Sequence, residues 1–343
     1  MSHHLYTVVI VGAGPGGLSV AAALLEAGFH PEDILVVDRG EVGQAWLDYP
    51  ADTHLLSESS PTKDDNEIAN VRTSEVFPNI PHPSHLMYQK YLDYVAQVKK
   101  IPVKKNTTVE NVFFNPEREE FVLNLRGDGY LTSKYVVWAA GMYYTPNEDL
   151  DMEGCYIHYA KLPYLDDIDA KEITVVGSAN GASGVVMQLA RPGRKVTLVV
   201  SREYQIPMPI DCLWKENMKF VQDMEREGLV DIVEHFRVKR IYKEGERYYL
   251  ESEDGKQLSS PEKPIICTGF LLNIEPVASL VDEVVEDREH HVDIDQDHQS
   301  KKQPGLYFAG VIGRFPGDTG FIISFREFGE PIAQSILEHE KER

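Results

Sequence analysis

The sequence predicts an α/β protein with two domains, each of which contains a strand–turn–helix unit. The second domain is inserted into the first. Two segments carry this prediction: "LYTVVIVGAGPGGLSVAAALLEAG" at residues 5–28 and "AKEITVVGSANGASGVVMQLARPGRKVTLVVSRE" at residues 170–203. Each has a β-branched apolar run, a glycine-containing turn and a stretch of small, helix-forming residues. A third segment, residues 304–337, adds a strand, a glycine-rich loop and a closing helix. We therefore expect two Rossmann-like dinucleotide-binding domains, one formed by residues 1–147 and 266–343 and the other by residues 148–265.

The composition limits the class of partner. The 343 residues include 34 Lys and Arg against 55 Asp and Glu, so the formal net charge is −21. This excess of negative charge disfavours nucleic acid as a partner. No apolar run approaches the roughly 20 residues of a membrane helix, and the first strand follows the N-terminus without a signal-like segment. We expect a soluble, cytoplasmic protein with neither a nucleic acid nor a membrane as its partner.

The first glycine loop has the spacing of a dinucleotide site. Gly12 permits a tight turn, Gly14 lets the backbone approach a diphosphate, and Gly17 lets the helix pack closely on the strand. The helix N-terminus offers unpaired N–H groups to the phosphate oxygens. The next strand, "DILVVD", ends at Asp38, whose carboxylate is expected to accept hydrogen bonds from a ribose hydroxyl.

The second glycine loop departs from that pattern in two places. Gly177 keeps the first glycine, whereas Ala179 and Ala182 replace the second and third. The following strand ends in Ser201 and Arg202, a pair that suits the 2′-phosphate of NADPH rather than the free ribose of NADH. A unit that keeps this shape without binding a nucleotide is the alternative.

The cysteines and histidines do not form a recognisable metal or dithiol motif. Cys155, Cys212 and Cys267 stand far apart in the sequence, so there is no C-x-x-C pair. Isolated cysteines are interpreted as small core residues. His82 and His85, in "PHPSHL", are interpreted as surface polar residues, and we predict no metal site.

The order of these parts resembles that of flavoproteins with two dinucleotide-binding domains, namely the thioredoxin reductase-like and flavin-containing monooxygenase-like families. The second loop, with Gly177, Asn180 and Ala182, is similar to the "G-x-x-N-x-A" form of the bacillithiol disulfide reductase branch. "LDYPADTHLLSESSP", "AGVI" and the pair Arg326 and Gly329 resemble the same branch. In that family the late glycine-rich loop lies beside the flavin pyrimidine, where a helix N-terminus stabilises negative charge on the reduced ring.

The resemblance implies a set of cofactor-binding residues but no catalytic side chain. The residues implied at FAD are Gly12, Gly14, Pro15, Gly16, Gly17, Asp38, Arg39, Gln44, Ala45, Trp46, Val109, Ala140, Gly141, Gly310, Asp318, Thr319, Gly320, Phe321 and Ile322. The residues implied at NADPH are Gly177, Asn180, Gly181 and Arg202.

Some residues depart from the disulfide reductases. Gly16 stands where the bacillithiol disulfide reductases carry a cysteine, and thiol exchange needs a thiolate. "GQAW", residues 43–46, is similar to the "G-G-x-W" element of the monooxygenases. Their "F-x-G-x-x-x-H" element is matched only at Gly154 and His158, since Met152 replaces the phenylalanine. His158 either orients the domain linker or is a plain surface histidine. The stretch "SREYQIPMPIDCLWKENMKF", which includes Tyr204, either lines a substrate or nicotinamide entrance or, as we favour, is an amphipathic segment packed on its domain.

These features predict an FAD-dependent NAD(P)H oxidoreductase that reduces or oxygenates a small-molecule substrate. Hydride passes from NADPH to FAD without a C-x-x-C dithiol. A low-molecular-weight disulfide reductase and a non-catalytic flavin-binding or redox-sensing protein are the alternatives. Families of this architecture often form homodimers, so a homodimer is one arrangement that the resemblance implies.

Overall fold

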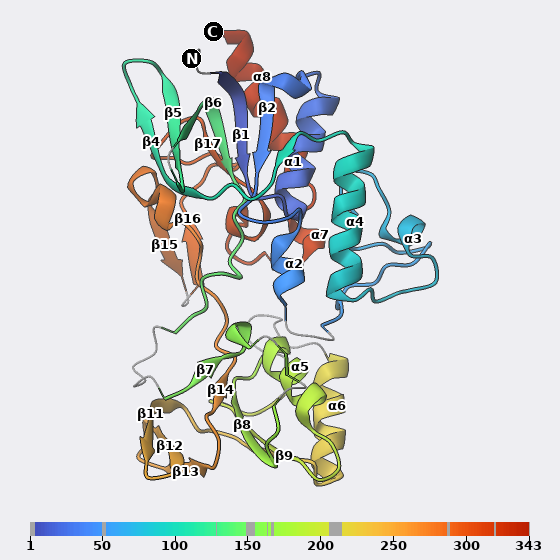
Figure 1. Ribbon diagram of the computed structural model, residues 1–343, viewed down its shortest axis with the longest axis vertical. Coiled ribbons are helices and arrows are strands. Elements are labelled where there is room, and N and C mark those ends of the chain that lie inside the picture. Colours follow the sequence, from blue (N-terminus) through green and yellow to red (C-terminus); the bar gives the residue numbers. More distant parts are fainter. Residues whose placement is uncertain are drawn as a thin grey trace. The chain divides into compact units, whose positions relative to one another are not determined.

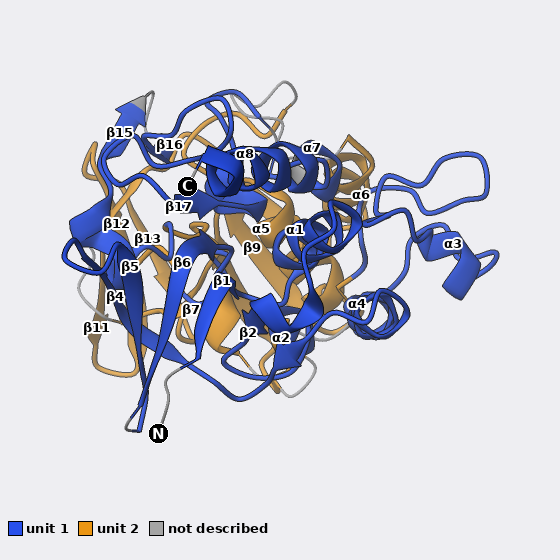
Figure 2. Ribbon diagram, turned by 90° about the horizontal axis from the view of Figure 1, so that it is seen from above, with its two compact units in different colours: residues 1–47, 54–144, 272–343 blue, residues 48–53, 145–271 orange. Residues whose placement is uncertain are grey.

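The computed structural model describes residues 4–49, 53–127, 129–148, 155–162, 164–165, 168–205, 215–286, 289–318 and 320–342. The chain forms two compact units (Figure 2). Unit 1 comprises residues 1–47, 54–144 and 272–343, and unit 2 comprises residues 48–53 and 145–271. No helix among the described residues is both long and apolar enough to cross a membrane.

Unit 1 is built on a seven-stranded mixed sheet with the order β3-β2-β1-β6-β5-β4, in which β17 also pairs with β6 (Figure 1). The strands are β1 (Leu5–Val11), β2 (Ile34–Val37), β3 (Val103–Lys104), β4 (Val109–Asn115), β5 (Glu120–Leu125), β6 (Tyr130–Trp138) and β17 (Leu306–Phe308). β1, β2, β3, β6 and β17 are joined by parallel pairings, whereas β4 and β5 extend the sheet as an antiparallel ribbon. The first half of β6 pairs with β5 and its second half with β17, so β6 joins both parts of the sheet.

Helices, 3₁₀ turns and a β-hairpin complete unit 1. They are α1 (Pro15–Glu26), α2 (Gln44–Asp48), α3 (Thr73–Val76), α4 (His85–Val98), α7 (Ile322–Phe325) and α8 (Gly329–Glu342), with 3₁₀ turns at Pro31–Asp33, Glu275–Leu280 and Gly310–Gly313 and a hairpin of β15 (Glu283–Glu286) and β16 (Glu289–Val292). α4 begins where the Ser84 hydroxyl accepts a hydrogen bond from the Met87 N–H (3.3 Å). α1 and α8 lie side by side in both ribbon views, because Gly329 brings α8 against the backbone of Ser19.

Unit 2 has a five-stranded parallel sheet with the order β10-β9-β8-β14-β7. Its strands are β7 (Ile157–His158), β8 (Glu172–Val176), β9 (Lys195–Val199), β10 (Val230–Val233) and β14 (Ile265–Ile266), and a 3₁₀ turn spans Tyr159–Lys161. α5 (Asn180–Leu189) and α6 (Lys215–Arg226) pack against each other and against this sheet. A separate antiparallel sheet consists of β11 (Val238–Glu244), β12 (Arg247–Ser252) and β13 (Gln257–Ser260).

The register of the parallel strands brings their carboxyl ends together in each unit. In unit 1, Val11 pairs with Val37 and with Trp138, and Trp138 pairs with Phe308. In unit 2, Val176 pairs with Val199 and with Ile266. The residues that follow these strands therefore form one edge of each sheet, which is where open α/β sheets bind ligands.

The two crossing segments of the chain pair with each other inside unit 2. The Leu271 N–H donates to the Thr145 carbonyl (2.8 Å), and the Asn147 N–H donates to the Gly269 carbonyl (2.9 Å). His158 is tied to one of them, because its Nε2 donates to the same Gly269 carbonyl (3.0 Å) while its Nδ1 accepts from the Ala160 N–H (3.2 Å). Burial lowers the pKa of His158, which favours this neutral, bridging form.

Candidate cofactor site

The first glycine loop is packed so closely that Gly12 and Gly17 have no room for a side chain. Gly12 has a φ of +113°, a backbone conformation that glycine adopts readily, and its N–H donates to the Val37 carbonyl (2.8 Å). A Cβ at Gly12 would lie within 3.0 Å of the Ala139 carbonyl, and a Cβ at Gly17 within 3.0 Å of the Gly12 carbonyl. These two glycines therefore hold β1, β6 and α1 together.

Gly14 has the opposite surroundings. It is the N-cap of α1, Pro15 follows at the first helical position, and a Cβ added to Gly14 would meet no heavy atom within 4 Å. The space therefore lies directly in front of the helix N-terminus, where backbone N–H groups and the helix dipole favour an anion. The loop thus fits the diphosphate of a dinucleotide.

Asp38 is held beside this loop by two backbone hydrogen bonds. Its Oδ2 accepts from the Ala13 N–H (2.8 Å), and its Oδ1 accepts from the Gly40 N–H (2.9 Å). Burial raises the pKa of Asp38, although both hydrogen bonds oppose that rise. Each carboxylate oxygen keeps a second acceptor position, so the group can still accept from a ribose hydroxyl.

The space for a side chain at Gly16 is filled by the Gly310 backbone, a contact that the sequence did not reveal. A Cβ at Gly16 would lie 2.5 Å from the Gly310 Cα and even closer to the Gly310 nitrogen. Both are backbone atoms, which cannot move as a flexible side chain would. A cysteine therefore does not fit at this position without a backbone shift.

The other residues predicted at FAD fall into two groups. Some surround the loop: the Gln44 side chain accepts from the Glu41 N–H (2.9 Å), Trp46 meets Tyr88 edge to face (4.7 Å between centroids), and Ala45 lies between them on α2. Others follow strands of unit 1: Ala140 and Gly141 follow β6, and the exposed Arg39 follows Asp38 and stacks on Tyr144 (3.6 Å to the ring centroid). Val109 is buried in the core at the start of β4, so its backbone is the part available to a ligand.

The late glycine-rich loop is anchored by a histidine that the sequence reading missed. The Nδ1 of His298 donates to the Gly313 carbonyl (2.8 Å), and its ring lies between Phe328 (4.0 Å) and Phe315 (4.9 Å). Asp318 closes the same loop by accepting from the Phe315 N–H (3.0 Å). No motif marked His298, because it contacts this loop across 15 residues of sequence.

The remaining predicted residues of this loop lead into a short helix. Gly320 lies near Val311, Phe321 is the N-cap of α7, and Ile322 is buried. Thr319 lies outside the described residues.

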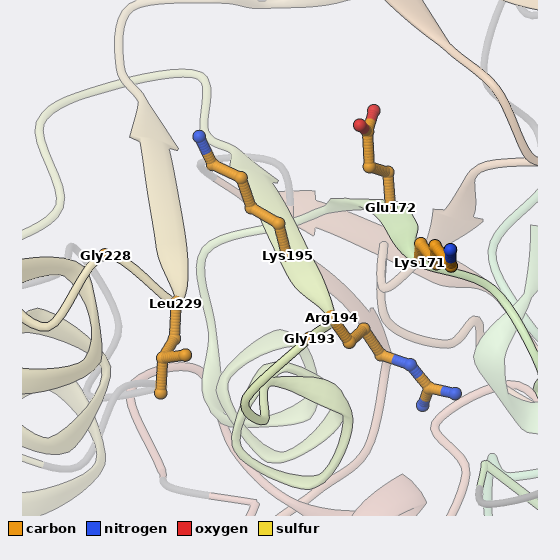
Figure 3. A pocket seen from close by; sticks show the side chains of 7 residues that line it. All are labelled: Lys171, Glu172, Gly193, Arg194, Lys195, Gly228 and Leu229. Atoms are coloured by element: carbon orange, nitrogen blue, oxygen red, sulfur yellow. The ribbon is translucent and has the colours of Figure 1, made fainter.

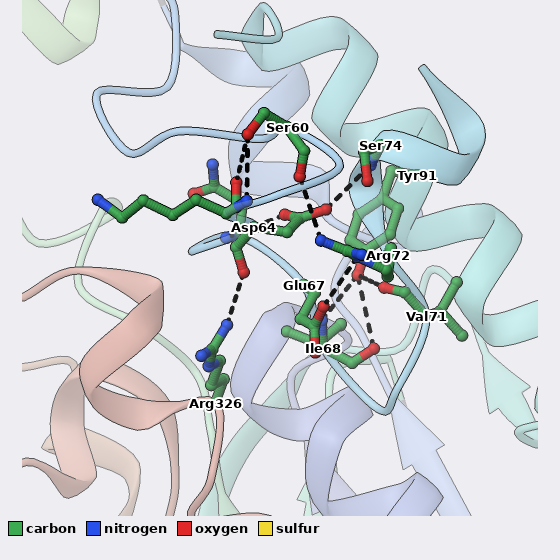
Figure 4. Close-up of polar contacts among 11 residues, drawn as sticks. Ser60, Asp64, Glu67, Ile68, Val71, Arg72, Ser74, Tyr91 and Arg326 are labelled. Atoms are coloured by element: carbon green, nitrogen blue, oxygen red, sulfur yellow. Dashed lines mark hydrogen bonds and ion pairs between the residues drawn. The ribbon is translucent and has the colours of Figure 1, made fainter. Parts of the chain in front are cut away.

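A buried polar cluster ties the segment after α2 to α4 and to the end of α7 (Figure 4). The Tyr91 hydroxyl accepts from the Ile68 N–H (2.7 Å) and donates to the Val71 carbonyl (2.6 Å). The Asp64 carboxylate accepts from the Ser74 N–H (3.0 Å), and Arg326 donates to the Asp64 carbonyl (2.8 Å). Arg326 thereby joins this segment to the helix that follows the late glycine-rich loop.

The second glycine loop, in unit 2, has the same strand–turn–helix geometry as the first loop but is surrounded by different residues. The Gly177 N–H donates to the Val199 carbonyl (3.0 Å), and a Cβ there would lie 2.5 Å from the Cys267 carbonyl oxygen. Ala179 is the N-cap of α5, and the Asn180 side chain accepts from Asn217 (3.1 Å). Gly181 lies against the Tyr159 side chain, and an added Cβ would be 3.2 Å from the Tyr159 hydroxyl oxygen.

Arg202 follows β9 on an exposed turn. Arg202 and Glu203 are exposed, whereas Val200 and Tyr204 on either side are buried. No described residue forms an ion pair with the Arg202 guanidinium. Tyr204 does not line an entrance but packs in the core of unit 2, as the favoured interpretation expected.

The cysteines and histidines differ in exposure. Cys267 is buried, and burial raises the pKa of its thiol far above the usual range; Cys155 is half-buried, and Cys212 lies outside the described residues. The expectation that His85 is a surface residue is wrong, since it is 5% exposed and its Nδ1 donates to the Trp46 carbonyl (2.6 Å). Among the described residues no three His, Cys, Asp or Glu side chains are grouped to hold a metal ion. Met152 and Gly154 also lie outside the described residues.

A shallow depression of about 280 Å³ lies at the opposite edge of the unit 2 sheet, where β8 and β9 begin (Figure 3). Lys195, Glu172 and Arg194 direct their charged ends in different directions there. Arg194 is used internally, because it donates to the carbonyls of Ala170 and Ile168. The lining therefore lacks a convergent set of ligand groups.

Comparison with known proteins places the chain in a family. Residues 9–310 match the family described as pyridine nucleotide-disulphide oxidoreductase, which spans most of the chain. The chain belongs to this family. Membership confirms, at the level of the family, the expected oxidoreductase that uses FAD and NAD(P)H.

Proteins that are similar to this chain in sequence include a reductase and a monooxygenase. Bacilliredoxin reductase Bdr of Bacillus subtilis (strain 168) is 28% identical over 199 residues, covering 56% of this chain and 56% of the relative. Indole-3-pyruvate monooxygenase YUCCA1 of Oryza sativa subsp. japonica is 27% identical over 198 residues, covering 56% of this chain and 47% of the relative. The chain therefore aligns with about half the length of each.

A solved structure of similar fold covers nearly the whole chain. The bacillithiol disulfide reductase Bdr (YpdA) of Staphylococcus aureus has a TM-score of 0.84 at 20% identity, covering 98% of this chain and 99% of that one. This similarity confirms the predicted α/β fold with two Rossmann-like units.

Proposed function

We propose that this protein transfers hydride from NADPH to FAD and passes the electrons to a small-molecule acceptor or to oxygen without using a protein thiol. The observation that carries the proposal is the open space at Gly14, in front of α1, with the Asp38 carboxylate fixed beside it. A second strand–glycine–helix unit, with Arg202 exposed after β9, supports a separate site for NADPH. The proposal places the enzyme in the cytoplasm, as a homodimer.

The chain's own residues hold and orient both nucleotides in this proposal. The N-terminus of α1 and Gly14 bind the FAD diphosphate, and Asp38 accepts from the ribose. The N-terminus of α5, with Asn180 and Gly181, binds the diphosphate of NADPH, and Arg202 pairs with its 2′-phosphate. Bound FAD supplies the redox chemistry by accepting a hydride and releasing its electrons to the second substrate. Residues 1–147 and 266–343 form the FAD domain, and residues 148–265 form the NADPH domain.

The surroundings of the thiols support a mechanism that does not use a protein thiol. Gly16 lies against the Gly310 backbone, which leaves no space for the cysteine of the disulfide reductases. Cys267 is buried, and its raised pKa keeps the thiol protonated and unreactive at neutral pH. A dithiol mechanism would therefore need Cys155 and Cys212.

Anaerobic mixing with NADPH and with NADH, followed at the flavin absorbance, tests the proposal. Rapid bleaching by NADPH, and slower bleaching by NADH, is expected. Air is then admitted, with and without candidate substrates. Formation of an oxygenated product selects a monooxygenase, whereas anaerobic transfer to an organic acceptor selects a reductase. No bleaching with either nucleotide would contradict the proposal and favour a flavin-binding or sensory protein.

A low-molecular-weight disulfide reductase is the second candidate, favoured by the similarity to Bdr of Bacillus subtilis and Staphylococcus aureus. The variant Cys155→Ser/Cys212→Ser/Cys267→Ala separates the two candidates. NADPH-driven reduction of a low-molecular-weight disulfide that is present in the native enzyme and lost in this variant would support the thiol mechanism. Disulfide reduction that is equal in the native enzyme and in this variant would exclude the thiol mechanism and support the proposal.

A further inference from the structure

A chain of three hydrogen-bonded groups connects the turn that carries Arg202 with the second glycine loop. The Tyr204 hydroxyl lies 2.7 Å from the Ser183 Oγ, and the Ser183 Oγ donates to the Ala179 carbonyl (3.2 Å). A serine hydroxyl has one hydrogen, which is directed to Ala179 here. Tyr204 is therefore the donor to Ser183, and the chain runs from Tyr204 through Ser183 to the N-cap of α5.

The two hydroxyl groups in this series of hydrogen bonds, those of Tyr204 and Ser183, are both buried. Tyr204 is 2% exposed and Ser183 is fully buried. Breaking a buried hydrogen bond leaves a polar group without a partner, which costs more than the loss of an exposed bond. Burial also raises the pKa of Tyr204 to about 12, so the hydroxyl keeps its proton at neutral pH.

The backbone of Tyr204 is fixed as well. Its N–H donates to the Glu234 carboxylate (2.8 Å), and its carbonyl accepts from the Gln222 side chain (3.3 Å). At the other end of the turn, the Val200 N–H donates to the Val233 carbonyl (2.9 Å). Arg202 therefore projects from a short turn that is held at both ends.

We propose that Tyr204 and Ser183 are positioning residues that determine the preference for a 2′-phosphorylated nucleotide. They hold Arg202 at a fixed place relative to the α5 N-terminus, so that one nucleotide meets the diphosphate loop and the guanidinium together. This inference rests on the proposed NADPH site. Ser183 and Tyr204 do not contact the nucleotide in this account and act only through Ala179 and Arg202.

Tyr204→Phe and Ser183→Ala test the inference in the full-length protein. The probes are 2′,5′-ADP and 5′-AMP as competitive inhibitors of NADPH-driven flavin reduction. In each variant the inhibition constant of 2′,5′-ADP is expected to rise about tenfold, which corresponds to the loss of one buried hydrogen bond. Each is expected to change 5′-AMP inhibition by less than about twofold, because the diphosphate loop itself is intact.

Tyr307→Phe is a matched control, because it removes another buried tyrosine–serine hydrogen bond, that of Tyr307 to Ser335 (3.0 Å) in unit 1. This control should leave the inhibition constants of both probes unchanged. Equal weakening of both inhibitors by Tyr204→Phe and by Ser183→Ala would overturn the inference, since it would indicate general loosening of unit 2. Unchanged inhibition by both probes would overturn it as well.

Arg202→Gln separates this inference from the proposed function. If Arg202→Gln leaves the ratio of the two inhibition constants unchanged, the assignment of the NADPH site itself fails. If Arg202→Gln abolishes the preference while Tyr204→Phe and Ser183→Ala keep it, only the positioning role fails. In the double variant Arg202→Gln/Tyr204→Phe, no further loss of 2′,5′-ADP affinity is expected, because Tyr204 acts through Arg202.

Discussion

A single added methyl group tests the first glycine loop, because Gly14 and Gly17 have opposite surroundings. Gly14→Ala meets no protein atom within 4 Å but enters the space proposed for the diphosphate. It is expected to lower FAD affinity roughly 10-fold to 100-fold and to leave the stability of the FAD-free protein within about 0.5 kcal/mol.

Gly17→Ala is the matched comparison. Its Cβ would collide with the Gly12 carbonyl, so the unfolding free energy of the FAD-free protein is expected to fall by about 1–3 kcal/mol. Flavin titration and urea unfolding measure the two effects. Equal FAD affinity in Gly14→Ala and the native protein would argue against a diphosphate at this position.

Gly16 gives the second prediction at this scale. Gly16→Cys introduces the residue found in the disulfide reductases, yet the Gly310 backbone occupies the space that its side chain needs. We expect a stability loss of about 1–3 kcal/mol and no gain of NADPH-dependent disulfide reduction. Thermal unfolding and a disulfide reduction assay check this. A stable variant with new disulfide reductase activity would show that the loop adapts to a thiol.

Among the elements, the segment joined to α4 depends on one buried hydroxyl. Tyr91→Phe removes the acceptor for the Ile68 N–H and the donor to the Val71 carbonyl. It is expected to lower the free energy of unfolding by about 1–3 kcal/mol. Tyr94→Phe lies on the same helix, where Tyr94 is 44% exposed, and should cost less than about 0.5 kcal/mol. Urea unfolding of the two variants gives the comparison. Equal costs would contradict a structural role for the Tyr91 cluster.

His298, which anchors the late glycine-rich loop, is expected to make the free energy of unfolding depend on pH. Burial lowers the pKa of His298 below 6.5, although the carboxylates of Asp295, Asp297 and Asp318 oppose this shift. Below pH 6.5 the unfolded chain therefore binds this proton more readily than the native protein does. The stability contributed by neutral His298 is complete above that pH and is lost as the pH falls.

His298→Gln removes this titration and should flatten part of the decline in unfolding free energy between pH 7 and about pH 5. His30→Gln, at an exposed histidine, is the control and should keep the native profile. Urea unfolding across this pH range measures both. An unchanged profile in His298→Gln would show that His298 does not contribute to the acid sensitivity.

For the whole molecule, the sequence predicted what local patterns encode. Strand, glycine spacing and helix are adjacent in the chain, so the loops at Gly12 and Gly177 and the acid at Asp38 were accessible from one sequence. The interruption of one Rossmann-like unit by another was accessible for the same reason, because each unit carries its own motif.

Contacts between distant residues were not accessible from the sequence. The closure of Gly16 depends on Gly310, nearly the whole chain away, and the anchoring of the late loop depends on His298. Neither has a local pattern, because packing selects the partner only after the sheet has formed. His85 was misjudged for the same reason, since nearby prolines suggested a surface position while its ring reaches the Trp46 backbone.

We propose above all that two separate dinucleotide sites pass electrons from NADPH to FAD. The most direct measurement is the anaerobic rate of flavin bleaching by NADPH and by NADH, in the native protein and in Arg202→Gln. Rapid bleaching by NADPH, slower bleaching by NADH, and loss of this preference in the variant are expected. Absence of bleaching in the native protein would contradict the claim and leave the second unit as a fold without a nucleotide.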